Sequence, residues 1–377
     1  MKKRGLLFLS LFALVLSACN ALPEENSGGD GQGESTESEP NTSNVVSRNQ
    51  LGEGYYRPAL DQEGSYQPSE SRGITLNLNS GINIALFEKD LIRLSQSLFP
   101  TDEYFMREGQ ELSSNIISSW LGRESENNPE GLNPPESGNE EDRTPRYLNS
   151  ILEFDFYTQS DDGLNLSGIS IGLAMNKVDY YQEEQFGPTL EQTISSEKVL
   201  EEGQRIGNEI VNRMRGIEGL EEIPIYVGIY EQTAQDDLAG GVYVAEGESS
   251  NGTTSVQNWE SINEERLIFP LEGGNSAEGN AFANFQSEVE SFFPNLSGIT
   301  GRAHRADDQL QNLTINIMTQ FYGEAEIVAF TQYLKQSAAT FLPADIDVEI
   351  IVESPDQVEA FLKKEHTDSE YSSYVFD

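Results

Sequence analysis

The sequence predicts an α+β fold made of two tandem units, with mostly antiparallel sheets packed by helices, on a disordered N-terminal tether. Apolar residues alternate at every second position in several short stretches, as in half-buried strands, and recur every three or four residues in longer ones, as in amphipathic helices. Residues 19–50 are rich in Ser, Gly, Glu and Asn and carry too few large apolar side chains to form a core. A polar interval around 246–257 separates two units, which we place at 51–250 and 257–365.

The N-terminus has the features of a secretory signal peptide over residues 1–18. Three positive charges are followed by an almost wholly apolar run at 6–16, and the small residues Ser17 and Ala18 stand before Cys19. The run is too short for a membrane-spanning helix, which needs about 20 apolar residues. We therefore expect cleavage between Ala18 and Cys19 and acylation of the Cys19 thiol, as in a bacterial lipoprotein. The alternative is an ordinary secretory signal in which this cysteine is incidental.

Cys19 is the only cysteine of the chain, so its acylation leaves the exported body without a thiol. Such a body has no disulfide, no zinc–thiolate site and no cysteine nucleophile, and its fold has to depend on apolar cores. Stable anchoring takes more than one fatty chain, which a diacylglyceryl group on the thiol supplies. The expected location is the cell membrane, lipid-anchored and facing the extracellular side.

The chain is strongly acidic, with 23 Lys and Arg against 64 Asp and Glu and a formal net charge of −41. Removal of residues 1–18 takes away three positive charges, which leaves 20 basic against 64 acidic residues, or about −44. Such a field repels nucleic acids, so they are excluded as partners. The acidic residues are dispersed, which favours a surface adapted to a saline or alkaline exterior over the recognition of a cationic ligand.

Within the first unit, the hydrophobic period predicts helices and strands in turn. Leu91, Leu94 and Leu98 share one helical face, and Asp161–Gly163 marks a turn between two alternating strands. An acidic loop at about 123–145, rich in Glu, Asn and Pro, is expected to be disordered. The expected elements are helices at 86–98, 111–120 and 195–215, and strands at 152–156, 164–175, 223–229 and 242–244.

The second unit repeats this pattern in shorter form. Each unit contains a strand, a long helix and a further strand, which suggests an ancient duplication. The expected elements are helices at 281–293 and 324–341, strands at 313–317 and 346–352, a last short helix at 355–362, and a polar tail that frays at 366–377.

Aromatic pairs beside the predicted strands are the best candidates for a ligand groove. Tyr180 and Tyr181 follow a strand of the first unit, and Tyr322 ends a strand of the second. Tyrosines at strand ends can line a groove for an extracellular peptide or glycan. They can equally cap an apolar core, and we favour that interpretation.

Residues that could carry catalysis are sparse or unspecific. The two histidines are His304, expected in a mixed-charge surface loop, and His366, expected in the polar tail. The sequence has no Gly-x-Ser-x-Gly elbow and no phosphate-binding loop with lysine. Acidic pairs are too frequent to indicate a site, and Asp161–Gly163 fits a hairpin turn better than a calcium loop. We expect no catalytic residue, metal or cofactor in the body.

Short strings scattered over the whole body are similar to those of one family. In order along the chain they include Leu98–Tyr104, Gly131–Pro134, Tyr147–Glu153, Ile171–Asn176, Trp259–Glu264 and Tyr322–Glu326. Together they run from about residue 51 to 353, and the body resembles the CamS-type sex-pheromone lipoproteins of low-GC Gram-positive bacteria.

This resemblance implies a precursor with two products. In that family the apolar end of the signal peptide, once trimmed, can serve as a secreted peptide pheromone, while the lipoprotein body remains on the membrane. The resemblance implies no activity for the body, which we therefore expect to be non-enzymatic. The alternatives are an extracellular module that binds peptide or glycan in an aromatic groove, and a hydrolase that uses carboxylates alone. The stretch that matches the pheromone is Phe12, Ala13, Leu14, Val15, Leu16, Ser17 and Ala18.

Overall fold

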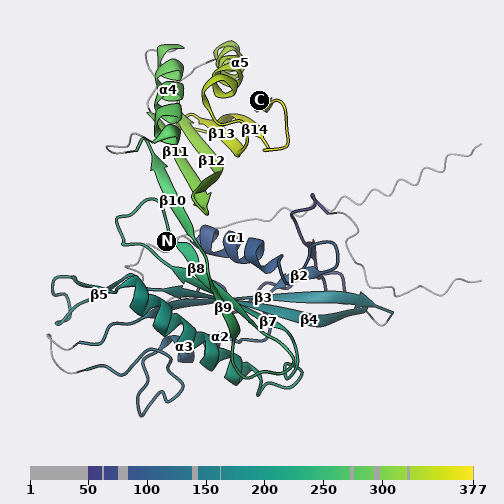
Figure 1. Cartoon of the computed structure of the whole chain (residues 1–377), viewed down its shortest axis with the longest axis vertical. Coiled ribbons are helices and arrows are strands. Elements are labelled where there is room, and N and C mark those ends of the chain that lie inside the picture. Colours follow the sequence, from purple (N-terminus) through teal and green to yellow (C-terminus); the bar gives the residue numbers. More distant parts are fainter. Residues whose placement is uncertain are drawn as a thin grey trace, which may run out of the picture. The chain divides into compact units, whose positions relative to one another are not determined.

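Two large β-sheets, a small two-stranded sheet and five helices make up the part of the chain that the structure describes (Figure 1). The structure is a computed structural model. All residues that it describes belong to one compact unit, Asn44–Asp377, and they confirm the predicted α+β class. Within them, no helix has the length and apolar character needed to cross a bilayer. The described residues are 50–61, 63–74, 84–137, 143–161, 163–271, 276–292, 298–320 and 323–376.

The first sheet has seven strands in the order β1-β2-β3-β4-β7-β8-β9. Neighbouring strands run antiparallel, except that β1 is parallel to β2 and β4 is parallel to β7. β5 and β6 form the separate antiparallel pair. The strands are β1 (Arg57–Pro58), β2 (Phe105–Glu108), β3 (Leu148–Ser160), β4 (Gly163–Met175), β5 (Val178–Tyr181), β6 (Leu190–Thr193), β7 (Ile225–Glu231), β8 (Val242–Ser249) and β9 (Gln257–Ser261).

The long hairpin of β3 and β4 forms at the turn predicted from the sequence. Gly163 has a φ of +123° there, a conformation that glycine adopts without strain. From Gly168 to Met175 every residue of β4 is buried, because helices cover both faces of the sheet. This is why the second half of β4 is almost continuously apolar.

Three helices pack on this sheet (Figure 1). The side chains of α2 and α3 join one apolar core, and those of α1 join a second core on the other face. Gly203 lets α3 approach β7 closely, since a Cβ there would lie 2.8 Å from the side chain of Ile229. The helices are α1 (Ile84–Ser95), α2 (Ser114–Leu121) and α3 (Ser196–Met214).

The second sheet has six strands in the order β10-β11-β12-β13-β14-β15, with β12 parallel to β13 and the other neighbours antiparallel. Helices α4 and α5 bury their apolar side chains in one core with this sheet. The elements are β10 (Glu264–Phe269), α4 (Ala277–Phe292), β11 (Gly298–Ala306), β12 (Gln309–Met318), α5 (Glu324–Phe341), β13 (Asp347–Glu353), β14 (Val358–Lys364) and β15 (Ser372–Val375).

The two large sheets share one topology. Without β1, the first reads β2-β3-β4-β7-β8-β9, and each set of six strands has a single parallel pair at its centre. A long helix joins the parallel strands in both cases, α3 between β4 and β7 and α5 between β12 and β13. Another helix joins the first two strands of each set, α2 in the first and α4 in the second. The shared order supports the duplication suggested by the sequence.

The C-terminal predictions of a short helix at 355–362 and a fraying tail at 366–377 are wrong. The first segment contains most of β14, whose alternate residues are buried on one face. β15 pairs with β14, and Tyr371 just before β15 is buried in the core. The apolar residues of such a short segment fit a helix or a strand, and pairing with β13 decided the outcome.

The polar interval at 246–257 is not a boundary between the units. Its first residues end β8 and its last begins β9, and the two strands pair with each other. Asn251 and Gly252 have φ values of +52° and +71°, so the interval is a tight turn rather than a linker. The chain passes from the first sheet to the second at residues 262–263, later than predicted.

Candidate functional site

Most of the predicted site lies outside the described residues. This holds for the acylation site Cys19, for Ala18 before it, and for the candidate pheromone segment Phe12–Ala18. It also holds for Tyr322 of the candidate groove. These assignments stay predictions.

The other two tyrosines of the candidate groove lie on β5 and contact the chain itself. The Tyr180 hydroxyl accepts a hydrogen bond from the backbone N–H of Gln235 (3.0 Å). The guanidinium of Arg143 stacks on the ring of Tyr181, 3.9 Å from its centroid. Without Tyr322, the groove formed by all three tyrosines also stays a prediction.

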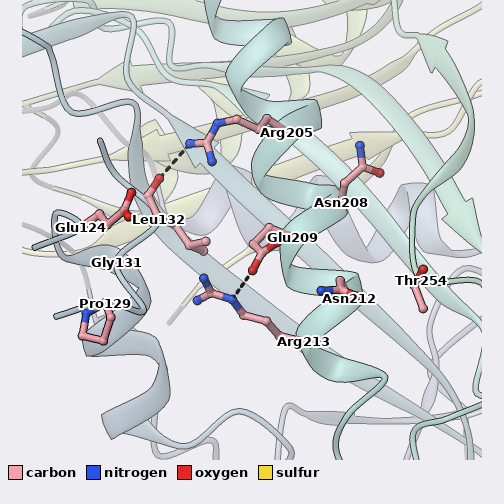
Figure 2. Close-up of a pocket in the computed structure, with 10 residues that line it drawn as sticks. All are labelled: Glu124, Pro129, Gly131, Leu132, Arg205, Asn208, Glu209, Asn212, Arg213 and Thr254. Carbon is pink, nitrogen blue, oxygen red and sulfur yellow. Dashed lines mark hydrogen bonds and ion pairs between the residues drawn. The ribbon is translucent and has the colours of Figure 1, made fainter. Parts of the chain in front are cut away.

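A polar hollow of about 470 Å³ opens on the outer side of α3 (Figure 2). A stripe of α3, opposite its apolar stripe, forms the floor. The loop after α2 and the turn between β8 and β9 form the walls. Two arginines and two glutamates balance in charge, so the lining is close to neutral in a strongly acidic chain. The lining residues are Glu124, Pro129, Gly131 and Leu132 of the loop, Arg205, Asn208, Glu209, Asn212 and Arg213 of α3, and Thr254 of the turn.

Two arginines tie the loop to the helix beside the hollow, and Figure 2 shows the bond between Arg205 and Leu132. Arg205 donates from Nη2 to the carbonyl of Leu132 (2.9 Å). Arg213 donates from Nη1 to the carbonyl of Glu130 (2.7 Å) and from Nε to the carboxylate of Glu209 (2.7 Å). Both guanidiniums are thus used to hold the wall in place.

This wall belongs to the acidic stretch 123–145, and its described part is ordered, contrary to the prediction. Asn133 is fully buried, and its Oδ1 accepts hydrogen bonds from the N–H groups of Tyr147 and Leu148 (2.8 and 2.9 Å). Leu132 joins the core of the first sheet. One buried amide and a few apolar contacts thus hold a stretch whose composition alone indicates disorder.

Two buried carboxyls lie on one face of β3, at Glu153 and Asp155. Glu153 accepts hydrogen bonds from the backbone N–H groups of Glu111 (3.2 Å) and Leu112 (3.0 Å). Asp155 accepts one from the backbone N–H of Gln110 (2.9 Å). The pair is sealed by backbone rather than open to a ligand, and neither carboxyl lines the hollow.

Both carboxyls of the acid pair resist ionisation. Burial raises the pKa of Glu153 to about 7, although the N–H groups of Leu112 and Glu111 oppose the rise. Burial and the neighbouring charge of Glu153 raise the pKa of Asp155 well above its usual range. Asp155 lies deeper than Glu153 and accepts fewer backbone hydrogen bonds, so its charged form is the less stabilised of the two.

Asp155→Asn is expected to stabilise the protein at pH 8 and to flatten its pH dependence. Because the folded-state pKa is raised, the folded state binds more protons than the unfolded state above about pH 4, and stability falls as the pH rises. The asparagine amide can accept the hydrogen bond from the backbone N–H of Gln110 without titrating. Urea unfolding at several pH values between 4 and 8 measures how the free energy of unfolding changes with pH. The exchange of the exposed Asp102 in Asp102→Asn is the control. If the free energy of unfolding of Asp155→Asn fell with pH as steeply as that of the native protein, the pKa of Asp155 would not be raised in the folded state.

A second group of charged side chains, most of them buried, joins α1 to β10 and β11. Asp90 of α1 pairs with Arg266 of β10, and Arg93 of α1 pairs with Glu264 of β10 (2.8 Å). The Nε2 atom of His304 lies 3.0 Å from Glu264. Burial works to raise the pKa of Glu264, but the hydrogen bond from His304 and the charge of Arg93 outweigh it and lower that pKa.

His304 therefore does not occupy the surface loop predicted from its charged neighbours. It lies in β11 and is buried, with 4% of its surface exposed. Arg302, two residues earlier on the same face, is exposed, and Arg305 pairs with Glu265 and Glu278, so neither flanking arginine shares the buried environment of His304. His366 is exposed, as expected.

Hydrogen bonding is the chemistry that the hollow offers. Within the described residues, no group of three or more His, Cys, Asp or Glu side chains is placed to hold a metal ion. Asn208 and Asn212 are not among the site residues predicted from the sequence, which are aromatic residues and the signal-peptide residues. Their spacing on the polar side of α3, between Arg205 and Arg213, was the available signal.

A family model described as CamS sex pheromone cAM373 precursor matches residues 66–370. A solved sex pheromone precursor from Lactobacillus salivarius subsp. salivarius is 36% identical, with a TM-score of 0.81, and the match covers 87% of this chain and 98% of that one. The C-terminal domain of the sex pheromone staph-cAM373 precursor from Staphylococcus aureus is 29% identical, with a TM-score of 0.69 and coverage of 78% and 97%. Curated proteins give no match to the chain.

Proposed function

The chain belongs to the CamS sex pheromone cAM373 precursor family, and from this premise we propose that it is an exported lipoprotein whose signal peptide also yields a secreted peptide. The observation that carries the proposal is Cys19, the only cysteine, placed directly after a short apolar run and two small residues. Cleavage before Cys19 would release the segment Phe12–Ala18 at the end of the signal peptide.

The negative charge of the body indicates that the protein is held at the membrane by its lipid and not by its own surface. The mature chain carries about −44 (20 basic against 64 acidic residues), and such a field repels anionic headgroups. Each buried CH₂ of a fatty chain contributes about 0.8 kcal/mol, so the acyl chains have to supply the attraction. The body then faces the extracellular side on the segment that follows Cys19.

The acid pair supports a non-enzymatic body. A carboxylate hydrolase needs two carboxyl groups that reach a substrate across a cleft. Glu153 and Asp155 are instead 3% and 0% exposed and bonded to backbone N–H groups. Their arrangement suits a structural role better than that of an acid and base in catalysis.

Cys19→Ala is expected to move the protein from the membrane fraction to the medium, because it removes the thiol that carries the acyl chains. Ser10→Ala, in the apolar run of the signal peptide, is the matched control and should leave the protein in the membrane fraction. Fractionation followed by a high-salt wash and immunoblotting measures the distribution. If the Cys19→Ala protein stayed bound through the wash, acylation of this thiol would not be the anchor.

A further inference from the structure

We propose that the hollow on α3 binds an extended stretch of peptide by its main chain, with Asn208 and Asn212 as the recognising residues. The site lies on the described body, so it does not depend on the lipid anchor or on the fate of the signal peptide.

The spacing of the two asparagines fits an extended chain. They are four residues apart on α3, which is about 6 Å along a helix that rises 1.5 Å per residue. An extended chain presents equivalent main-chain groups on one edge at every second residue, about 6.6–6.8 Å apart. A side-chain amide carries N–H donors and a carbonyl acceptor, the same pair of groups as a peptide unit. Two such amides can therefore pair with successive units along one edge of a peptide.

The first amide is already oriented by the fold. The Oδ1 atom of Asn208 accepts a hydrogen bond from the backbone N–H of Val256 (2.9 Å), which leaves the Nδ2 hydrogens as donors. The side chain of Asn212 is exposed, and among the described residues it has no hydrogen-bond partner. Asn208 is thus fitted to donate to a peptide carbonyl, and Asn212 can both donate and accept.

The lining favours a neutral main chain over a charged or stacked ligand. Arg205 and Arg213 already bond to the carbonyls of Leu132 and Glu130, so they are poorly placed to capture an anion. The balanced charges of the lining give no preference for a cation. None of the lining residues is aromatic, so the site lacks the platform on which a sugar ring could stack.

The test is a titration of the full mature chain, labelled with ¹⁵N-asparagine, with N-acetyl-tetra-alanine amide as probe. We expect saturable shifts of the Asn208 and Asn212 side-chain amide signals, with a dissociation constant in the millimolar range. Asn208→Asp keeps the acceptor for Val256 but removes the donors, and Asn212→Ala removes the second amide. Each variant is expected to weaken binding about five-fold, since it removes one or two hydrogen bonds.

The counterpart helix α5 offers a matched control, because Gln332 and Gln336 are exposed amides at the same four-residue spacing. The Gln332→Ala/Gln336→Ala variant should bind the probe as the native chain does. The proposal is overturned if the probe does not bind, if it binds equally to the Asn208→Asp and Asn212→Ala variants, or if a tetramer of N-acetylglucosamine shifts these signals and the peptide does not. None of these outcomes bears on the membrane fractionation of Cys19→Ala.

Discussion

Replacing Arg215 with methionine is expected to lower the free energy of unfolding by about 3–5 kcal/mol. Arg215 follows α3 and is 8% exposed. Each buried acceptor left without a donor costs roughly 1–3 kcal/mol, and this exchange leaves several at once. The guanidinium makes five hydrogen bonds of 2.6–3.1 Å, to the carbonyls of Leu220, Ile223, Ser249 and Thr253 and to the hydroxyl of Ser249.

Urea unfolding measures this loss as a lower midpoint with an unchanged slope. Arg213→Met is the matched control, because Arg213 also lies at the end of α3 but its partners are more exposed: it pairs with Glu209, whose side chain is 41% exposed, and donates to the carbonyl of the exposed Glu130. An exposed ion pair of this kind contributes up to about 1 kcal/mol to the free energy of unfolding. Equal losses for the two variants would contradict the role given to Arg215, which is to join the end of α3 to the ends of the neighbouring strands.

Asp90→Ala is expected to be destabilising to a similar extent, by about 3–5 kcal/mol, because it leaves the buried guanidinium of Arg266 without its carboxylate. The side chains of Asp90 and Arg266 are 5% and 6% exposed. Within the described part of the chain, Arg266 would keep only its hydrogen bond to the carbonyl of Gly241 (3.2 Å). Thermal or urea unfolding measures the change.

The double variant Asp90→Ala/Arg266→Met separates the penalty of an unpaired charge from other effects of the substitution. Removing both charges is often close to neutral, so the double variant should be more stable than Asp90→Ala alone. If the loss in unfolding free energy of the double variant equalled the sum of the losses of the two single variants, Asp90 and Arg266 would not be coupled. The contact between α1 and β10 would then have to depend on other groups.

Elements with a strong and unbroken period could be predicted from the sequence. The helix expected at 324–341 has those bounds in the structure, and the predicted hairpin forms at Asp161–Gly163. In both, local apolar spacing or turn residues determine the outcome, without help from distant parts of the chain.

Elements that depend on distant partners could not be predicted. β15 exists because it pairs with β14, and β9 exists because it pairs with β8. The loop 123–137 is ordered by Asn133, whose hydrogen bonds reach the start of β3. By composition such segments are polar and look like linkers. Only their hydrogen bonds to distant parts of the chain distinguish them from linkers.

In the candidate site, too, local features could be predicted from the sequence and features that depend on distant residues could not. The amides of Asn208 and Asn212 could be placed on one side of a helix from their spacing, but the walls come from residues far along the chain. The partners of His304 and Arg266 are also remote in sequence, in β10 and α1. Burial of a charge depends on such partners, so His304 was expected at the surface.

Mass spectrometry of the native protein from the membrane fraction tests the central claim most directly. Trypsin would release the N-terminal peptide from Cys19 to Arg48, since no other Lys or Arg lies between them. The proposal predicts that this peptide begins at Cys19 and carries a diacylglyceryl group on its thiol, and that the medium contains a peptide derived from Phe12–Ala18. A native protein that begins at Met1, or an unmodified Cys19 in the membrane-bound protein, would contradict it.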